Sequence, residues 1–140
     1  MHYDRFVTLI KFAFPALALV YLLKTLEGTV TEYLFIDAKP MAVCHNLREK
    51  RHKIFKGLAK KGKTSTGWFF GFKLHFIFNT YGEIVIMQIT GSNIDDRSPV
   101  MTLVKDISAK LIGDKGYISK KLSAELFNQK VTLITKIKKK

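Results

Sequence analysis

Residues 68–78 show the most regular pattern in the chain, because apolar and polar positions alternate along them. A period of two residues is typical of a β-strand with one buried face. We therefore predict a strand whose aromatic side faces the core and whose polar side faces solvent. The aromatic side carries Phe70, Phe72, Leu74, Phe76 and Phe78, and the polar side carries Lys73 and His75.

A second strand is predicted directly after the first. Asn79-Thr80-Tyr81-Gly82 has the composition of a hairpin turn. Residues 83–90 follow it with several β-branched side chains, which favour a strand. Together these segments predict an antiparallel hairpin.

Three shorter apolar segments also predict strands. They are residues 33–38, bounded by Lys39-Pro40; residues 110–113, which run into Asp114; and residues 131–137, which precede a lysine tail. Two segments have helical spacing and predict helices on the sheet. One carries Val100, Leu103, Val104 and Ile107 behind Pro99, with Asp96 or Ser98 as a cap; the other follows Ser119 and carries Leu122, Leu126 and Phe127.

The predicted order is strand, basic loop (residues 44–67), hairpin, helix, strand, helix, strand. Such an order indicates an α/β fold in which helices cover a mixed sheet. The pattern does not determine the order of the strands within the sheet.

Residues 6–23 form an almost continuous apolar stretch. Its uninterrupted part, residues 12–23, is shorter than the roughly 20 residues that a membrane-spanning helix needs. The flanking residues lack the basic start and small-residue cleavage site of a signal peptide. We expect residues 1–30 to contain an apolar helix that packs against the rest of a larger protein, with a membrane segment as the alternative.

The composition indicates one globular domain with an anionic partner. The 140 residues are 47% hydrophobic, and 24 Lys and Arg stand against 11 Asp and Glu, a net charge of +13. Nucleic acid is the first candidate partner and an acidic membrane surface the second, although a merely well-solvated surface is possible. The single Cys44 excludes an internal disulfide framework and fits a reducing, cytoplasmic compartment.

Asp37 and Asp114 each end a short apolar strand. A carboxylate at a strand end can reach solvent or a metal ion, whereas burying it unpaired in a sheet is costly. Mg²⁺ takes one or two carboxylates together with phosphate oxygens and water. The pair therefore predicts a divalent-metal site for phosphoryl-transfer chemistry. The alternative is that each aspartate only accepts hydrogen bonds from a turn.

A basic run in residues 48–63 is the main candidate for binding DNA. Lysine and arginine that meet phosphates release counterions, so binding should depend steeply on salt. Trp68 and Phe69 follow the run and could stack on a flipped or frayed base, or could belong to the core. The predicted DNA contacts are Arg48, Lys50, Arg51, Lys53, Lys56, Lys60, Lys61 and Lys63, extended by Lys73 and Lys115.

Other candidate ligands favour simpler roles. Asp95 and Asp96 are adjacent, so their side chains should diverge, and we expect turn and capping roles. His45, His52 and His75 match no compact zinc spacing, and Cys44 stands alone. We expect His75 to be a surface residue on the polar side of its strand.

Six short motifs occur in a fixed order along the chain and resemble bacterial insertion-sequence transposases of the DDE class. The similarity runs from about residue 34 to 138. Its most specific part is the combination of the motifs at residues 71–75 and 113–118. The motifs are Phe35-Ile36-Asp37-Ala38-Lys39-Pro40, Cys44-His45-Asn46, Lys53-Ile54-Phe55-Lys56-Gly57, Gly71-Phe72-Lys73-Leu74-His75, Thr90-Gly91-Ser92-Asn93-Ile94-Asp95-Asp96-Arg97 and Gly113-Asp114-Lys115-Gly116-Tyr117-Ile118.

The resemblance implies an RNase H-like fold in residues 31–140, with residues 1–30 a remnant of the family's N-terminal region. It also implies that Asp37 and Asp114 are the first two members of an acidic triad that binds Mg²⁺ or Mn²⁺ for DNA cleavage and strand transfer. The third acid of such enzymes is a glutamate farther along the chain, and Glu125 follows Asp114 too closely to be it. We expect Glu125 to be a solvated surface residue. We therefore expect a transposase fragment, inactive alone.

The expected partners are transposon-end and target DNA, with a homodimer possible in the full-length family, and the expected location is the bacterial nucleoid. Two other hypotheses stay open. The chain could be a non-catalytic, basic nucleic-acid-binding module, or a small protein anchored in a membrane through residues 6–23.

Overall fold

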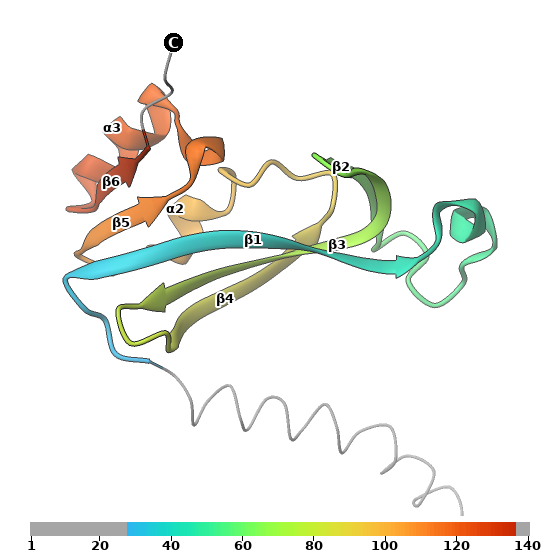
Figure 1. The fold of residues 1–140 in the computed structure, drawn as a ribbon, viewed down its shortest axis with the longest axis horizontal. Helices are drawn as coiled ribbons and strands as arrows, with labels where there is room; N and C mark the ends of the chain where they lie inside the picture. Colours follow the sequence, from blue (N-terminus) through green and yellow to red (C-terminus); the bar gives the residue numbers. More distant parts are fainter. Residues whose placement is uncertain (1–27, 137–140) are drawn as a thin grey trace, which may run out of the picture.

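The computed structural model describes residues 28–136, which are organised around one six-stranded mixed sheet (Figure 1). The long strand β3 pairs with β1 along one edge, and with β2 and then β4 along the other. β5 lies beyond β1, and β6 beyond β5. The strands are β1 (Tyr33–Cys44), β2 (Lys60–Thr64), β3 (Gly67–Asn79), β4 (Ile84–Gly91), β5 (Lys110–Gly113) and β6 (Thr132–Thr135).

The strand pairing changes from antiparallel to parallel at β1. β1 is antiparallel to β3, whereas β1, β5 and β6 are mutually parallel. Parallel neighbours need crossover connections, and the chain supplies them through the two predicted helical segments. The mixed α/β class predicted from the sequence is therefore confirmed, and the sheet has an RNase H-like arrangement.

Helical segments are few and short. α2 (Val100–Leu103) precedes β5, and α3 (Lys120–Asn128) connects β5 to β6. Two 3₁₀ segments, η1 (Asn46–Arg51) and η2 (Lys115–Tyr117), follow β1 and β5. Ser119 caps α3 as predicted, because its Oγ accepts a hydrogen bond from Leu122 N at 3.3 Å.

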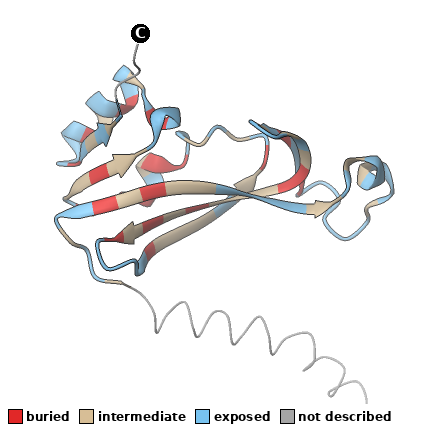
Figure 2. Ribbon diagram, viewed as in Figure 1, coloured by how far each residue is buried: buried red, intermediate tan, exposed pale blue. Residues whose placement is uncertain are grey.

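The core lies between one face of the sheet and the segment that contains α2 and α3. Leu34, Ile77, Leu111 and Leu126 are each 0% exposed there. Figure 2 shows buried residues on β1 and β5 and on the helical segments that pack against them. The predicted apolar face of α2 is confirmed, since its residues Val100 and Leu103 are buried together with Val104 and Ile107 beyond its end.

The two faces of β3 are reversed relative to the prediction. His75 is 0% exposed, and its Nε2 lies 2.8 Å from Thr90 Oγ1 on β4. Burial lowers the pKa of His75, which favours the neutral ring. The prediction that His75 faces solvent is wrong, because the helical segments cover its side of the sheet.

The aromatic side of β3 is only partly covered by the residues that the structure describes. Phe78 stacks on Phe35 of β1 with ring centroids 5.4 Å apart, and Phe76 lies 5.9 Å from Phe78. These rings shield one another, but Ile89 on β4 remains 53% exposed. Alternation identified the strand correctly without showing which face the helices would cover.

β1 continues beyond the predicted end at residue 38. Pro40 lies within it, opposite Lys73 of β3. β1 pairs with β5 only through Tyr33, Leu34 and Phe35, so at Pro40 its other edge has no strand beside it. Proline is tolerated at such an edge, because no ladder hydrogen bond is lost there.

The segment predicted as a basic loop contains regular structure. η1 begins after His45, and β2 forms a hairpin with the start of β3, with Lys63 opposite Trp68. Ser92 Oγ donates a hydrogen bond to the carbonyl oxygen of Lys60, which joins β2 to the end of β4. The sequence of β2 has no apolar side chain, so only its pairing with β3 defines it as a strand.

Two details of the predicted helices are wrong. α2 has only four residues and begins at Val100. Its N-cap is Pro99, which offers no side-chain cap, so neither Asp96 nor Ser98 caps it. Phe127 of α3 is 74% exposed and does not contribute to the core.

The predicted apolar helix of residues 1–30 lies almost entirely outside the described residues, which begin at Gly28. Within residues 28–136, no helix has the length and apolar character needed to cross a membrane.

We expect the buried and partly covered faces of the sheet to respond differently to truncation. Ile77→Ala removes a fully buried side chain and should lower the free energy of unfolding by about 2–5 kcal/mol. Ile89→Ala, on the neighbouring strand, should cost less than about 1 kcal/mol. Urea denaturation followed by circular dichroism measures both. Equal losses would contradict the assignment of the core face.

Candidate active site beside the end of β5

Asp37 lies within β1, not at its end as predicted, whereas Asp114 directly follows the last residue of the neighbouring parallel strand β5. Phe35 of β1 pairs with Ile112 of β5, and each aspartate lies two residues farther along its chain. Side chains two residues apart share a face, and adjacent strands are about 4.8 Å apart. The register therefore places both carboxylates on one face of the sheet, beside each other.

The Asp37 carboxylate is oriented by its own strand. Its Oδ1 accepts a hydrogen bond from Ala38 N at 2.8 Å, and its Oδ2 lies 3.0 Å from Lys39 Nζ. The side chain is 40% exposed and that of Lys39 is 65% exposed. Because this ion pair is open to solvent, Lys39 can move away at little cost when another cation approaches.

Asp114 is the N-cap of η2. Its Oδ1 accepts a hydrogen bond from Gly116 N at 2.8 Å, which fixes the carboxylate at the point where β5 ends. A Cβ at Gly116 would lie 2.9 Å from the same oxygen. The glycine of this motif thus leaves room for the carboxylate to fold back over the turn.

Tyr117 forms the floor beneath the two aspartates. It is 2% exposed, and a Cβ at Gly113 would come within 3.0 Å of its ring and 3.2 Å of Ile36. Burial raises the pKa of Tyr117, and the negative charges of Asp96, Asp37 and Asp114 raise it further. Tyr117 therefore stays a neutral phenol that packs the ends of β1 and β5 together.

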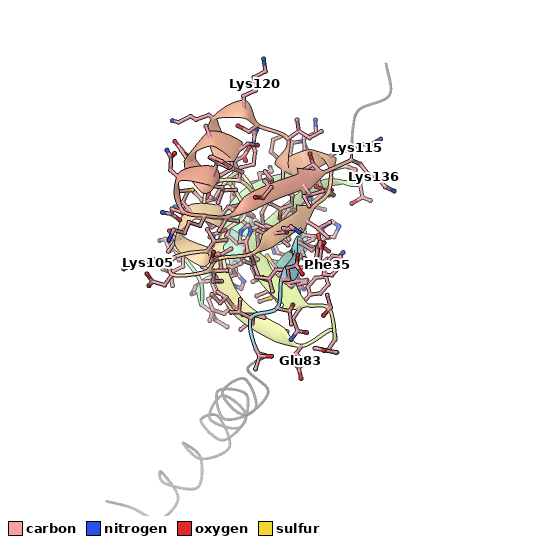
Figure 3. All side chains as sticks on the ribbon, turned by 90° about the vertical axis from the view of Figure 1, so that its left-hand side faces the viewer. Phe35, Glu83, Lys105, Lys115, Lys120 and Lys136 are labelled. Carbon is pink, nitrogen blue, oxygen red and sulfur yellow. The ribbon has the colours of Figure 1, made fainter. Side chains whose placement is uncertain are left out.

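A groove of about 780 Å³ opens in front of the carboxylates. Its apolar wall comes from the partly covered face of the sheet and its charged rim from the strand ends. Figure 3 shows Phe35, Lys115 and Lys136 on one side of the molecule and Lys105 on the other. The lining includes Phe35, Asp37, Phe78, Ile112, Asp114, Lys115, Ile134 and Lys136.

The segment after β4 carries a second pair of acids that point in different directions. Asp95 accepts hydrogen bonds from Arg97 N at 2.9 Å and from its Nε at 2.8 Å, which confirms the predicted turn role. Asp96 Oδ1 lies 2.8 Å from Lys73 Nζ, which also donates to the carbonyl oxygen of Ile94. Lys73 was expected to contact DNA, but its side chain is 13% exposed and is occupied by these partners.

The other predicted basic residues gather at the opposite end of β1, around η1 and β2 (Figure 1). A second groove of about 710 Å³ lies among them. Glu49 also lines it and lies 3.7 Å from Lys61. The groove is lined by Lys50, Arg51, Lys53, Lys56, Lys60 and Lys61 together with His52 and Phe70.

The structure thus joins the two predicted acids and separates them from most of the predicted basic residues. Lys115 is the exception, since it borders the carboxylate groove. Lys39 and Lys136 also belong to this site and were not predicted. Lys39 was recognisable in principle, because it follows Asp37 by two residues on one strand and must share its face.

No third carboxylate joins the pair within residues 28–136, and no cluster of three His, Cys, Asp or Glu side chains occurs there. Glu125 lies on α3, where it is 43% exposed and 3.9 Å from Lys121. This surface pairing agrees with the prediction that Glu125 is a solvated residue.

Comparison with known proteins identifies the family. A family model described as a transposase DDE domain matches residues 27–140. The chain belongs to this family. The resemblance inferred from the six motifs is confirmed at this level.

A solved structure shares the fold of this DDE domain. The protein in a cryo-EM structure of the piggyBac transposase synaptic complex with hairpin DNA superposes with a TM-score of 0.53 at 14% sequence identity. The match covers 81% of this chain but only 25% of that one. No curated protein sequence matches the chain. The likeness therefore supports the fold and spans a quarter of the larger protein.

We expect Arg97 to determine the acidity of Asp95 in the loop of the DDE domain. Hydrogen bonds from the Arg97 side chain and backbone lower the pKa of Asp95 from 3.8 to about 2. Arg97→Gln should return this pKa towards 3.8, as measured by NMR titration of the carboxyl carbon. Lys105 is exposed and does not contribute to the shift of Asp95, so Lys105→Gln should leave the pKa of Asp95 unchanged.

The corresponding effect on stability has a defined sign. The pKa of Asp95 is lower in the folded state, so the pair stabilises the fold above about pH 4 and ceases to do so as the pH falls towards 2. Both side chains are exposed, so solvent screens the pair and the gain in stability should be small. An Asp95 pKa that is unaffected by Arg97→Gln would contradict the assignment.

Proposed function

We propose that this DDE domain takes part in the metal-dependent cleavage and transfer of DNA strands during transposition of a bacterial insertion sequence. The observation that carries the proposal is the position of Asp37 in β1 and of Asp114 directly after β5, two residues beyond the paired Phe35 and Ile112 and beside an open groove. Family membership supports it, because transposases act on DNA phosphodiesters.

The two carboxylates fit a divalent cation. Asp37 is partly exposed and Asp114 is exposed, both offer hard oxygen donors, and each is already oriented by a backbone N–H. Mg²⁺ is held by one or two carboxylates plus water and phosphate oxygens, and Mn²⁺ accepts the same ligands. When bound, such an ion activates the attacking oxygen and stabilises the leaving one.

The chain itself supplies position and charge at this site. The paired strands hold the carboxylates side by side, and Tyr117 packs beneath them. Lys115 and Lys136 border the groove, where their ammonium groups can attract the DNA backbone. Lys39 forms a solvent-exposed ion pair with Asp37, which a bound cation would have to displace.

We further propose that Asp37 and Asp114 do not complete the catalytic site by themselves. The described residues place only these two carboxylates together. Two carboxylates can hold an ion, but strand cleavage by a DDE transposase uses three acids. A further acidic ligand must therefore be supplied before the site becomes active.

The surface proposed to bind DNA has two parts. One part is the basic lobe formed by residues 45–64. It contains the eight lysines and arginines of the predicted basic run, from Arg48 to Lys63. The other is the groove rim with Lys115. Transposon-end and target DNA are the proposed partners. The proposed location is the bacterial cytoplasm, in association with the nucleoid. The full-length protein is proposed to act as a dimer.

Metal binding tests the proposed site directly. Mn²⁺ should bind the purified chain, as followed by electron paramagnetic resonance of the free ion. Loss of an outer partner of a metal site typically costs about 10- to 100-fold in affinity, so Asp37→Asn and Asp114→Asn should each cost at least about tenfold.

Asp106→Asn is the matched control for these variants. Asp106 is exposed and has a positive φ of 66°, a conformation that asparagine adopts readily. This variant removes the same charge away from the site and should leave Mn²⁺ affinity unchanged. Equal losses in all three variants would refute a site at Asp37 and Asp114. Retained DNA binding would then favour the non-catalytic nucleic-acid-binding module.

Charge reversal tests the basic lobe. Replacing Lys50, Arg51 and Lys53 with glutamate should weaken binding to duplex DNA of any sequence. Each lost phosphate contact should also flatten the plot of log affinity against log salt by about 0.9. Fluorescence anisotropy of labelled DNA at several salt concentrations measures both effects. A triple variant with unchanged affinity would show that DNA does not use this lobe.

A further inference from the structure

The side chain of Trp68 lies at the surface and is not part of the hydrophobic core. Its side chain is 56% exposed, although it belongs to the same long strand as buried Phe70 and Ile77. Phe70, two residues farther on the same face, is 7% exposed and packs edge-on against His52. The core of the lobe therefore closes at Phe70 and leaves the Trp68 ring outside.

The backbone holds Trp68 firmly in spite of this exposure. Lys63 pairs with it across the β2–β3 hairpin, and Asn46 Nδ2 donates a hydrogen bond to its carbonyl oxygen at 2.6 Å. Gly67 precedes it with φ of +133°, which a residue with a side chain rarely adopts. An exposed ring on a fixed backbone is suited to contact a flat ligand, because little conformational entropy is lost on binding.

Two lysines of β2 approach the same ring. Lys61 Nζ and Lys63 Nζ each lie 5.8 Å from the centroid of the Trp68 ring, within cation–π range. Both can also reach a phosphate, since each nucleotide places its phosphate a few ångströms from its base. The hairpin thus combines one aromatic platform with two positive charges.

This combination distinguishes between possible ligands. Duplex DNA hides the faces of its bases, so a duplex could use the lysines but not the ring. An unpaired nucleotide offers a free π-face and a phosphate together, and bases stack on exposed aromatic side chains of any protein that brings them close. A ligand without charge would gain nothing from Lys61 and Lys63.

We propose that the β2–β3 hairpin is a binding site for an unpaired nucleotide, whose base stacks on Trp68 while Lys61 and Lys63 contact its phosphates. The inference rests on the proposed function in one respect, namely that the ligand is DNA, and it does not require the carboxylates. It assigns the basic lobe a preference for single-stranded or flipped bases over intact duplex.

Trp68 is the only tryptophan in the chain, so its fluorescence reports this contact directly. Oligothymidylate should quench the emission strongly as it binds, in buffer containing EDTA. Duplex DNA at equal occupancy should quench it much less, and a duplex with one extrahelical nucleotide should restore the quenching. Occupancy is measured independently by the anisotropy of labelled DNA.

An abasic oligonucleotide of the same length is the decisive control, because it keeps the phosphates and removes the bases. It should bind with little quenching. Quenching by the abasic strand equal to that by oligothymidylate would overturn the proposal, because the lysines alone would then account for the signal. The same conclusion would follow if no ligand changed the emission although DNA was bound.

Substitutions separate stacking from charge. Trp68→Ala should lower affinity for oligothymidylate by about 5- to 100-fold without changing the salt slope, whereas Trp68→Phe should retain most of the affinity. Lys61→Gln with Lys63→Gln should flatten the slope by about 0.7 per charge on single strands. Tyr81→Ala, which removes a 79% exposed aromatic at the β3–β4 turn, is the matched control and should have no effect.

The outcome is independent of the catalytic proposal. The variants Asp37→Asn and Asp114→Asn should bind oligothymidylate as the unaltered chain does. Oligothymidylate should also quench their Trp68 fluorescence to the same extent. Loss of Mn²⁺ binding with intact quenching would refute the metal site and leave the nucleotide site standing. A salt-dependent affinity that Trp68→Ala does not change would refute the nucleotide site and leave the metal site untouched.

Discussion

The pairing of β1 with β5 is the constraint on which the candidate site depends. Only three residue pairs define it, from Tyr33 with Lys110 to Phe35 with Ile112. These few backbone contacts decide that Asp37 and Asp114 come level with each other. A slip of one residue would turn Asp114 to the opposite face, towards the core. Tyr117 and Gly113 secure the register from below, because the aromatic ring fills the space that a side chain at Gly113 would occupy.

The sequence predicted most strands and the class of fold, but not which side of the sheet is buried. Alternation along β3 is equally consistent with either face being covered. The helical segments bury His75, and Thr90 on the neighbouring strand offsets part of the cost with a hydrogen bond. That partner is apparent only once β3 and β4 are in register. The short strand β2 had no apolar signal at all. Its existence depends on pairing with β3 and on the Ser92 contact with Lys60.

The two acids could be named from the sequence, whereas their surroundings could not. Asp37 and Asp114 end apolar segments and belong to recognisable motifs, which are local features. Lys73 lies in such a motif too, but its ion pair with Asp96 joins residues more than twenty positions apart. Lys136 and Lys115 border the same groove only because β6 follows β5 in the sheet. Contacts of this kind require the topology.

The length of β3 sets how far the tryptophan ring lies from the carboxylates. Phe76 of β3 lies opposite Asp37, and Trp68 precedes Phe76 by eight residues on the same strand. Eight residues of strand extend about 26 Å. At about 3.4 Å per base pair, this is close to eight base pairs of duplex. A continuous strand therefore fixes the distance between the proposed metal site and the proposed nucleotide site.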